Sequence, residues 1–374
     1  MPAERAVNRQ TDPVTTLRAA HVVTPRGVLA PGEVEIDGGV IRDVRPAAGD
    51  VTFHLLGPGL IDLQVNGVGS IDVWEADHDD WDRMAGALLD HGVTAWCPTL
   101  VSRPLDEYRA ALDRLARAAR RSDGPEIVGV HLEGPFLAPR RRGAHRPDAL
   151  APIDLDWLRA LPDVVRIVTL APELDRGIEA VRLLAARGTL VGLGHSEASF
   201  ETALEAIDAG ARLVTHLYNG MEPLHHRRPG LVGAALSDHR VTISLIADLV
   251  HVHPGALRLA FETKGIEGAV LVSDAVAAGV ASLAGPVEAR DGAPRLADGT
   301  LAGSTLTLDR AVANAVACGA VGVERALAAA ASAPAALLGL GDRGRIEPGC
   351  RADLVALTPS NRVEGVWVAG DRRR

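Results

Sequence analysis

The chain has 374 residues, of which 47% are hydrophobic and 23% charged, and this composition excludes disordered and fibrous proteins. Its formal net charge of -9 gives no general attraction to nucleic acid or to an anionic membrane, so an anionic ligand would need a local cluster of positive groups. The three cysteines are far apart and form no CxxC pair, which argues against a disulfide framework and favours a reducing cytoplasm.

The sequence starts with a polar segment, residues 1–5, and this segment leads into no apolar run. We therefore expect neither export nor membrane insertion. Short β-like runs separated by Gly and Pro then follow, with a hairpin turn expected at residues 37–39. These runs predict an antiparallel sheet and cover residues 15–23, 33–37, 40–45 and 51–56.

From residue 58 onward, apolar strand-like runs alternate with amphipathic helical patterns such as the one over 104–121. Eight strand-helix units that close on themselves are the simplest architecture for this alternation, so the sequence predicts an α/β protein with a (β/α)8 TIM-like barrel. The eight runs are 59–66, 93–100, 126–133, 166–171, 189–195, 212–217, 241–247 and 268–273.

The C-terminal part contains a Gly/Pro-rich insertion near 280–303, helices to about 340, and two strand-like runs at 352–357 and 363–369. Two strands cannot form a stable sheet alone, so we expect them to complete the N-terminal one. The predicted organisation is a small β-sandwich domain from residues 1–57 and 341–374, with the barrel over 58–340.

Polar residues recur where the predicted barrel strands end. Glu133, His195 and His216 follow the third, fifth and sixth strands, and one carboxylate with two imidazoles makes a three-ligand site for a catalytic metal with an open position for water. A single histidine at a strand end is more often structural. Several at the same end of successive strands favour the metal interpretation, because a barrel carries its catalytic groups on that face.

The residues resemble a known family, the N-acetylglucosamine-6-phosphate deacetylases of the amidohydrolase superfamily. The resemblance extends over nearly the whole chain, and its most specific part is THLYNGM followed closely by HHRRPGL. It implies hydrolysis of the acetamide of N-acetylglucosamine 6-phosphate to glucosamine 6-phosphate and acetate. The matching motifs include HLEGPF (131–136), GHSEA (194–198), THLYNGM (215–221), HHRRPGL (225–231), VSDA (272–275) and LAGSTLT (301–307).

The same resemblance assigns catalytic roles to two further residues. Asp274 matches the general base, which would take a proton from metal-bound water and later give it to the departing amine. His251 matches a residue that contacts substrate and helps to polarise the carbonyl; the alternative is a structural histidine at the barrel rim.

The first barrel strand ends in Gln64-Val65-Asn66, where many amidohydrolases have His-x-His. Carboxamides are weaker ligands than imidazoles, so we expect one divalent metal ion per chain rather than two. Zinc suits the ligand set best, with iron, manganese or cobalt as alternatives. Gln64 and Asn66 would then orient water, or simply pack.

A positive cluster at 225–228 offers a site for a phosphomonoester on this acidic chain, and Arg227 is the best single candidate because a guanidinium fits phosphate oxygens. The resemblance implies a homodimer in which Arg227 reaches the substrate of the neighbouring subunit. Arg228 is the alternative phosphate contact, and a solvated basic loop is the alternative to both.

Motif matching to the family assigns the remaining substrate contacts, of which His145 could equally be structural. The neighbouring arginine run 140–142 could steer phosphate or simply be solvated. The matched contacts are Ala144, His145, Asn219, Gly220, Asp248, His251, Leu301, Ala302 and Gly303.

Three functions are therefore compared. The favoured one is the sugar-phosphate deacetylase. The second keeps metal-assisted amide hydrolysis but changes the substrate, to N-acetylgalactosamine 6-phosphate or an N-acyl amino acid. The third is a non-catalytic barrel, which the joint presence of Glu133, His195, His216 and Asp274 disfavours.

Overall fold

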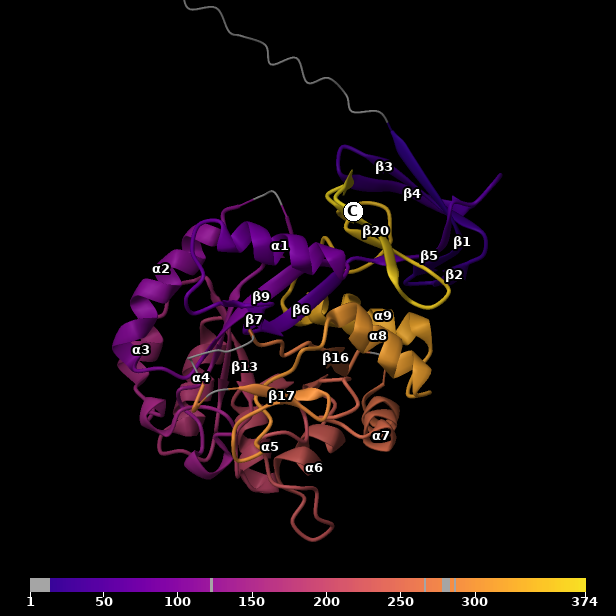
Figure 1. Cartoon of the computed structure of the whole chain (residues 1–374). Helices are drawn as coiled ribbons and strands as arrows, with labels where there is room; N and C mark the ends of the chain where they lie inside the picture. The colour runs from indigo at the N-terminus through magenta and orange to yellow at the C-terminus, as the bar shows by residue number, and fades with distance from the viewer. Residues whose placement is uncertain (1–13, 122–123, 266, 278–282, 286) are drawn as a thin grey trace, which may run out of the picture.

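The computed structural model of the protein describes residues 14–374 except 122–123, 266, 278–282 and 286. The polar segment 1–5 and part of the insertion near 280–303 lie outside the described residues. Two bodies are visible in Figure 1, a barrel surrounded by helices and a smaller sheet to one side of it.

The predicted barrel is confirmed. Within the described residues, parallel strands pair in the order β6, β9, β11, β12, β13, β14, β15 and β16, and the expected strand 126–133 is interrupted at 128–129 to give β10 and β11. The strands are β6 (Leu60–Val65), β9 (Val93–Val101), β10 (Glu126–Ile127), β11 (Val130–Glu133), β12 (Val165–Leu170), β13 (Leu190–Leu193), β14 (Leu213–Val214), β15 (Thr242–Leu245) and β16 (Ala269–Leu271).

Helices cover the outside of the barrel, and the amphipathic ones among them present an apolar face to the protein interior. In the helix expected over 104–121, for example, Tyr108, Leu112 and Leu115 are buried at helical spacing. The helices are α1 (Asp80–Asp90), α2 (Tyr108–Ala118), α3 (Leu155–Arg159), α4 (Gly177–Ala186), α5 (Phe200–Asp208), α6 (Gly230–Ser237), α7 (Pro254–Lys264), α8 (Leu308–Ala317), α9 (Val323–Ala330) and α10 (Ser332–Leu337).

β6 and β16 meet where the barrel closes, and there the ladder is reduced to a single bridge between Val65 and Ala275. The carboxylate of Asp62 connects the two strands here, because its Oδ1 accepts hydrogen bonds from the backbone N–H groups of Gln64 and Ser273, each at 3.2 Å. Burial raises the pKa of Asp62 to about 7. Gln64 and Asp274 directly precede the bridged residues Val65 and Ala275, so both lie at this joint.

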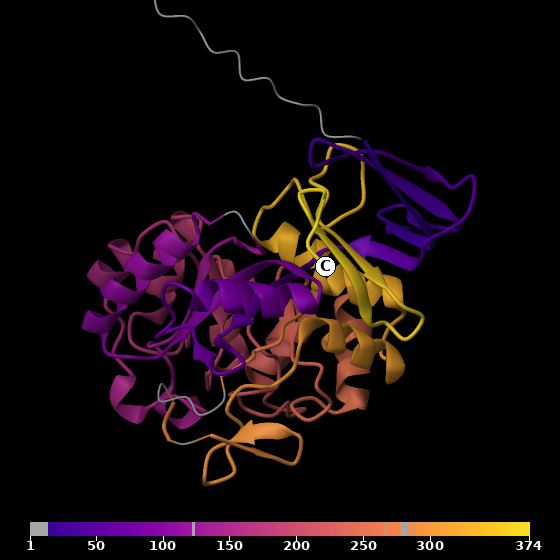
Figure 2. The same cartoon turned by 45° about the horizontal axis from the view of Figure 1, so that its top comes forward.

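The small β domain expected from both chain ends is present beside the barrel (Figure 2). Its strands form one continuous sheet in the order β21-β20-β19-β5-β1-β3-β4, with β2 beside β1, and have a hydrophobic cluster of their own. The strands are β1 (Thr15–Thr24), β2 (Gly27–Leu29), β3 (Gly32–Asp37), β4 (Val40–Pro46), β5 (Phe53–Pro58), β19 (Leu354–Leu357), β20 (Val363–Val368) and β21 (Asp371–Arg372).

One detail of the N-terminal prediction is wrong, since β5 pairs with β1 in parallel rather than antiparallel. The chain passes from β4 to the opposite side of β1 before it enters β5, and the other edge of β5 then pairs with β19. The hairpin turn after Asp37 is confirmed, with Gly38 and Gly39 both at positive φ. The domain boundaries at residues 57 and 341 stay predictions.

Two small hairpins complete the chain at the barrel rim: β7 (Gly67–Val68) with β8 (Ile71–Asp72), and β17 (Glu288–Arg290) with β18 (Ala293–Arg295). Among the described residues, no helix combines the length and the apolar character needed to cross a bilayer.

Candidate metal and active site

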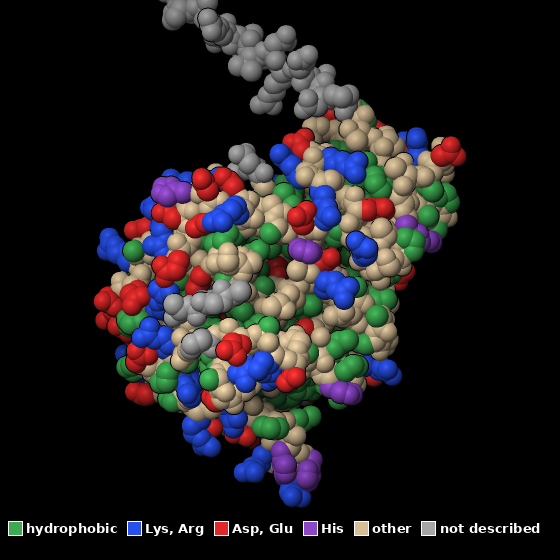
Figure 3. Space-filling view, in the orientation of Figure 1, with side chains coloured by type: hydrophobic (Ala, Val, Ile, Leu, Met, Phe, Trp, Pro, Cys, Tyr) green, Lys and Arg blue, Asp and Glu red, His purple; other side chains and the backbone are tan. Residues whose placement is uncertain are grey.

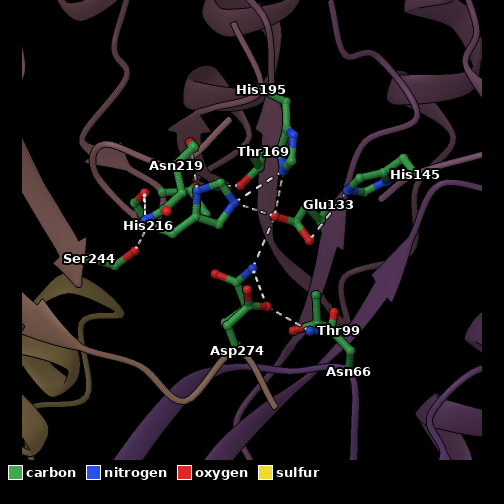
Figure 4. Close-up of polar contacts among 12 residues, drawn as sticks. Asn66, Thr99, Glu133, His145, Thr169, His195, His216, Asn219, Ser244 and Asp274 are labelled. Carbon is green, nitrogen blue, oxygen red and sulfur yellow. Dashed lines mark hydrogen bonds and ion pairs between the residues drawn. The ribbon is translucent and has the colours of Figure 1, made fainter. Parts of the chain in front are cut away.

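The three predicted metal ligands lie together at the carboxyl ends of their strands. Glu133 is the last residue of β11, while His195 and His216 follow β13 and β14 by two residues. Their side chains point toward one another in Figure 4. His195 and His216 both have positive φ, at 47° and 33°, a conformation that non-glycine residues adopt mainly at turns and functional sites.

The donor atoms of the three side chains form a compact triangle. Glu133 Oε1 lies 2.8 Å from His216 Nε2 and 3.3 Å from His195 Nε2, and the two Nε2 atoms are 3.1 Å apart. Ligand atoms at about 2.0–2.1 Å from a tetrahedral Zn²⁺ would be separated by about 3.3 Å. The triangle therefore has close to the size that one such ion requires.

The hydrogen bonds of the two imidazoles define which nitrogen carries the proton. His195 Nδ1 lies 2.7 Å from the carbonyl oxygen of Arg141, and His216 Nδ1 lies 3.2 Å from that of Asn219. A carbonyl only accepts, so each Nδ1 donates and, in the neutral imidazole, each Nε2 presents a lone pair to the centre of the triangle. Three electron-rich atoms facing one another fit a cation, and this is the ligand orientation typical of metal-binding histidines.

His145 contributes to the same cluster, since Glu133, His145 and His195 also have potential ligand atoms within 4.8 Å of one another. His145 Nδ1, however, accepts the backbone N–H of Ser102 at 3.2 Å, which assigns the proton of the neutral ring to Nε2. That Nε2 lies 3.7 Å from Glu133 Oε2. Burial lowers the pKa of His145 to about 3, so its ring is neutral. His216, whose Nε2 lies 2.8 Å from Glu133 Oε1, is the better third ligand.

The electrostatics keep Glu133 in the charged form that a metal ligand needs. Burial by itself would raise the pKa of its carboxyl, but hydrogen bonds from His195 and His216, made when their Nε2 atoms carry a proton, hold that pKa well below its usual range. Burial similarly opposes charge on His216, and the contact with Glu133 outweighs it and raises the pKa of His216.

Asp274, the expected general base, follows β16 and faces this triangle. Gln64 Nε2 donates to Glu133 Oε1 and to Asp274 Oδ1, both at 3.0 Å, and Asn66 Nδ2 donates to the same Oδ1 at 2.7 Å. Both amide donors thus contact Oδ1, so Oδ2 is the oxygen that remains for proton exchange. Burial, together with the negative charge of Glu133, raises the pKa of Asp274 to about 6.

His251 and Asp248 form a second acid-imidazole pair at the edge of the site. His251 Nδ1 lies 2.6 Å from Asp248 Oδ2, and Asp248 Oδ1 accepts the backbone N–H groups of Val250 and His251. Hydrogen bonds to His251 outweigh the effect of burial and lower the pKa of Asp248. The ionised Asp248 therefore fixes the ring of His251, whose other nitrogen remains for substrate.

A cavity of about 290 Å³ joins these groups and brings most of the predicted contacts together. Three predicted residues are not among the described lining residues: Ala302 and Gln64, which are buried, and Asp248, which is half-buried. Gln64 and Asp248 contact lining residues through hydrogen bonds. The predicted residues that line it are Asn66, Glu133, Ala144, His145, His195, His216, Asn219, Gly220, His251, Asp274, Leu301 and Gly303.

Gly220 has a packing role as well. It lies at φ +62°, and a Cβ there would come within 2.8 Å of His195 Nδ1. Only glycine allows this close approach of the backbone to the imidazole ring.

The basic cluster lies elsewhere, on a loop that projects from the barrel between α5 and α6 (Figure 1). Histidine and arginine side chains gather at its tip (Figure 3). His226, Arg227 and Arg228 are exposed, and the rings of His225 and His226 stack at 4.5 Å. Within one chain, Arg227 is thus not part of the described cavity lining.

Sequence reasoning missed the groups that support the predicted ligands. The Arg141 carbonyl that orients His195 is one, and backbone carbonyls leave no signal in a sequence. Glu173 is another: it accepts hydrogen bonds from the Ser196 hydroxyl at 2.7 Å and the Glu197 backbone N–H at 2.5 Å. Arg141 at least lies five residues after the HLEGPF motif, whereas Glu173 is far in sequence from both HLEGPF and GHSEA and carried no such signal.

Comparison with known proteins agrees with this geometry. The sequence matches the amidohydrolase family over residues 55–373, which include all barrel strands and every residue of the ligand triangle. This chain belongs to the amidohydrolase family.

Similar proteins of this family cover the chain almost completely. It is 40% identical over 369 residues to an N-acetylgalactosamine-6-phosphate deacetylase of Escherichia coli O157:H7, covering 95% of this chain and 98% of that protein. It is also 40% identical over 352 residues to the N-acetylglucosamine-6-phosphate deacetylase of Bos taurus, covering 88% and 86%.

Solved structures give the same result. The N-acetyl-D-glucosamine-6-phosphate deacetylase of Mycobacterium smegmatis, as a variant in complex with N-acetyl-D-glucosamine-6-phosphate, superposes with a TM-score of 0.89 at 34% identity, over 96% of this chain and 99% of that one. The Thermotoga maritima N-acetylglucosamine-6-phosphate deacetylase gives a TM-score of 0.88 at 31% identity, with the same coverage.

Proposed function

We propose that this amidohydrolase hydrolyses the acetamide of N-acetylglucosamine 6-phosphate, releasing glucosamine 6-phosphate and acetate. The observation that carries the proposal is the triangle of Glu133, His195 and His216 with Asp274 beside it in one cavity. The relatives named as deacetylases of 6-phosphorylated N-acetylhexosamines support the choice of substrate.

Glu133, His195 and His216 would hold one divalent cation, most simply zinc. When bound, the cation would acidify water and stabilise the oxyanion that forms when water adds to the amide carbonyl. A single ion is supported by Gln64 and Asn66, whose neutral amides occupy the end of β6 and donate to carboxylates. Metal analysis of the purified protein would identify which of zinc, iron, manganese and cobalt is bound.

Asp274 would move the proton. Its Oδ2 accepts a proton from the attacking water and delivers it to the amine, which leaves poorly unless it is protonated. A pKa near 6 suits both steps, because the carboxylate is ionised at neutral pH and still basic enough to accept the proton. His251, held by Asp248, would contact the substrate and help to polarise its carbonyl.

The phosphate requires a positive group that the described cavity lining of one chain does not include, since no Lys or Arg is among the described lining residues. The projecting loop with Arg227 can supply one to a second copy of the chain. We therefore include in the proposal a homodimer in which Arg227, rather than Arg228, binds the 6-phosphate at the neighbouring site. A cytoplasmic location is consistent with Cys97, Cys318 and Cys350, which are all free thiols.

N-acetylgalactosamine 6-phosphate is the second candidate substrate, because the relative from Escherichia coli O157:H7 is named for it and matches 95% of this chain. The two sugars differ only in the orientation of one hydroxyl.

The deciding experiment incubates metal-loaded protein with each of the two sugars and measures acetate release, with Asp274→Asn as the inactive control. Faster release from the gluco sugar is the expected result. Faster release from the galacto sugar would make N-acetylgalactosamine 6-phosphate the preferred substrate. No acetate from either sugar would reject both substrates.

A further inference from the structure

Arg141 lies at the junction of the three loops that surround His195. Its backbone carbonyl accepts the Nδ1–H of His195 at 2.7 Å, and its guanidinium Nη2 contacts the carboxylate of Glu222. Its Nε lies 3.6 Å from Glu197. One residue thus joins the loop after β11 to the loops that follow β13 and β14.

The backbone around this junction is reciprocally bonded. His195 returns a contact to the same segment, because its carbonyl accepts the Ala138 N–H at 2.9 Å. Ser196 N–H donates to the Gly220 carbonyl at 3.0 Å, which connects the loop of His195 to the loop of His216. The position of the Arg141 carbonyl therefore determines the direction in which His195 Nε2 points.

The ion pair with Glu222 is well placed to hold that carbonyl. The side chains of Arg141 and Glu222 are 25% and 44% exposed. Glu222 lies two residues after Gly220, at the base of the loop that carries the 225–228 cluster. A partly buried arginine-carboxylate pair is stronger and more directional than an exposed one. Arg140, by contrast, is 80% exposed and contacts only Glu197, at 3.5 Å, among the charged groups described.

We propose that Arg141 is a positioning residue for the metal site, which orients His195 through its carbonyl and is itself held by its ion pair with Glu222. This inference rests on the metal site of the proposed function but not on the identity of the substrate. Arg141, the middle residue of the 140–142 arginine run, would thus orient a metal ligand rather than steer phosphate.

Zinc affinity, measured by competition with a chelator of known affinity, tests the inference without any substrate. Arg141→Ala and Glu222→Ala should each weaken zinc binding by about tenfold, the lower end of the range typical for groups that orient metal ligands. The double variant should weaken it no further than either single one, because both changes remove the same interaction.

A charge exchange provides the sharpest comparison. Arg141→Glu alone should weaken zinc binding more than Arg141→Ala, and combining it with Glu222→Arg should restore most of the affinity. Arg140→Ala is the matched control and should bind zinc like the wild type. Thermal melting of the zinc-free proteins identifies any variant that has lost its fold.

Wild-type zinc affinity in a folded Arg141→Ala variant would overturn the inference, as would additive losses in the double variant. If Arg141→Ala does not fold, the zinc affinities of Arg141→Lys and of the folded charge-exchange variant test the inference instead. Failure of the charge exchange to recover zinc affinity overturns the inference. Loss of deacetylase activity towards every sugar would reject the proposed function while leaving these affinities interpretable.

Discussion

The Nε2 atoms of His195 and His216 lie 3.1 Å apart, and each ring donates its Nδ1 proton to a backbone carbonyl on the opposite side. Neutral rings in this arrangement direct two lone pairs at each other, next to the Glu133 carboxylate. The fold thus holds together groups that repel one another unless a cation or added protons lie between them.

Metal removal should therefore destabilise the protein at neutral pH. Treatment with a chelator should lower Tm by about 5 °C or more, since a ligand present at 1,000 times its Kd contributes about 4 kcal/mol. Differential scanning fluorimetry checks this, with recovery after zinc is added back.

Metal analysis should give one equivalent per chain, and His239→Ala, at an exposed histidine, should leave that content unchanged. Two equivalents that are both needed for full rate would contradict the single-ion prediction.

Asn66 should tune the pH dependence of the reaction. Its side chain donates to Asp274 at 2.7 Å and favours the ionised carboxylate. Asn66→Ala should raise the pKa of Asp274, so the acid limb of kcat/KM, measured between pH 5 and 8, should move to higher pH by about one unit. Asn361→Gly, in a distant turn, serves as control, and a limb that stays or moves to lower pH would contradict the role assigned to Asn66.

Arg227→Ala should raise KM for the phosphorylated sugar by about ten- to a hundredfold, because a charge-assisted contact is lost, and should leave unphosphorylated N-acetylglucosamine almost unaffected. Equal effects on both sugars would refute a phosphate role. Arg228→Ala in parallel identifies which arginine makes the contact.

Mixing subunits tests whether Arg227 acts across a dimer. Co-expressed Arg227→Ala and Asp274→Asn chains should regain up to about a quarter of the wild-type rate, since each mixed dimer has one complete site. Activity no higher than that of the separate variants would place Arg227 outside the neighbouring site.

Asp62 should make the protein less stable as pH rises. Its pKa of about 7 lies above the unfolded value, so the folded state retains a proton that the unfolded state loses, and this contribution to stability declines between about pH 4 and 7. Asp62→Asn removes that decline. Urea unfolding gives the difference in free energy of unfolding between Asp62→Asn and the wild type, and from pH 5 to pH 8 this difference should shift in favour of the variant by at most about 3 kcal/mol. Asp50→Asn, at an exposed position, should show no such shift.

The eight barrel strands were predictable because each is a short apolar run bounded by turn residues and buried on both faces. The direction of β5 was not, since nothing in its residues shows on which side of β1 the chain returns. The convergence of Glu133, His195 and His216 was predictable from their places at strand ends, whereas Arg141 contacts His195 through a carbonyl that every residue possesses.

Hydrophobic periodicity and strand-end position are local properties of the chain. The barrel, the domain formed from both chain ends, and the acid and histidines at one end of the barrel strands therefore follow from the amino-acid sequence alone. How these groups meet is a property of the folded chain. The 3.1 Å between the two imidazoles, the double donation of Gln64 to Glu133 and Asp274, and the ion pair of Arg141 with Glu222 depend on contacts between residues far apart in the chain, and their geometry is set by the packing of the whole barrel.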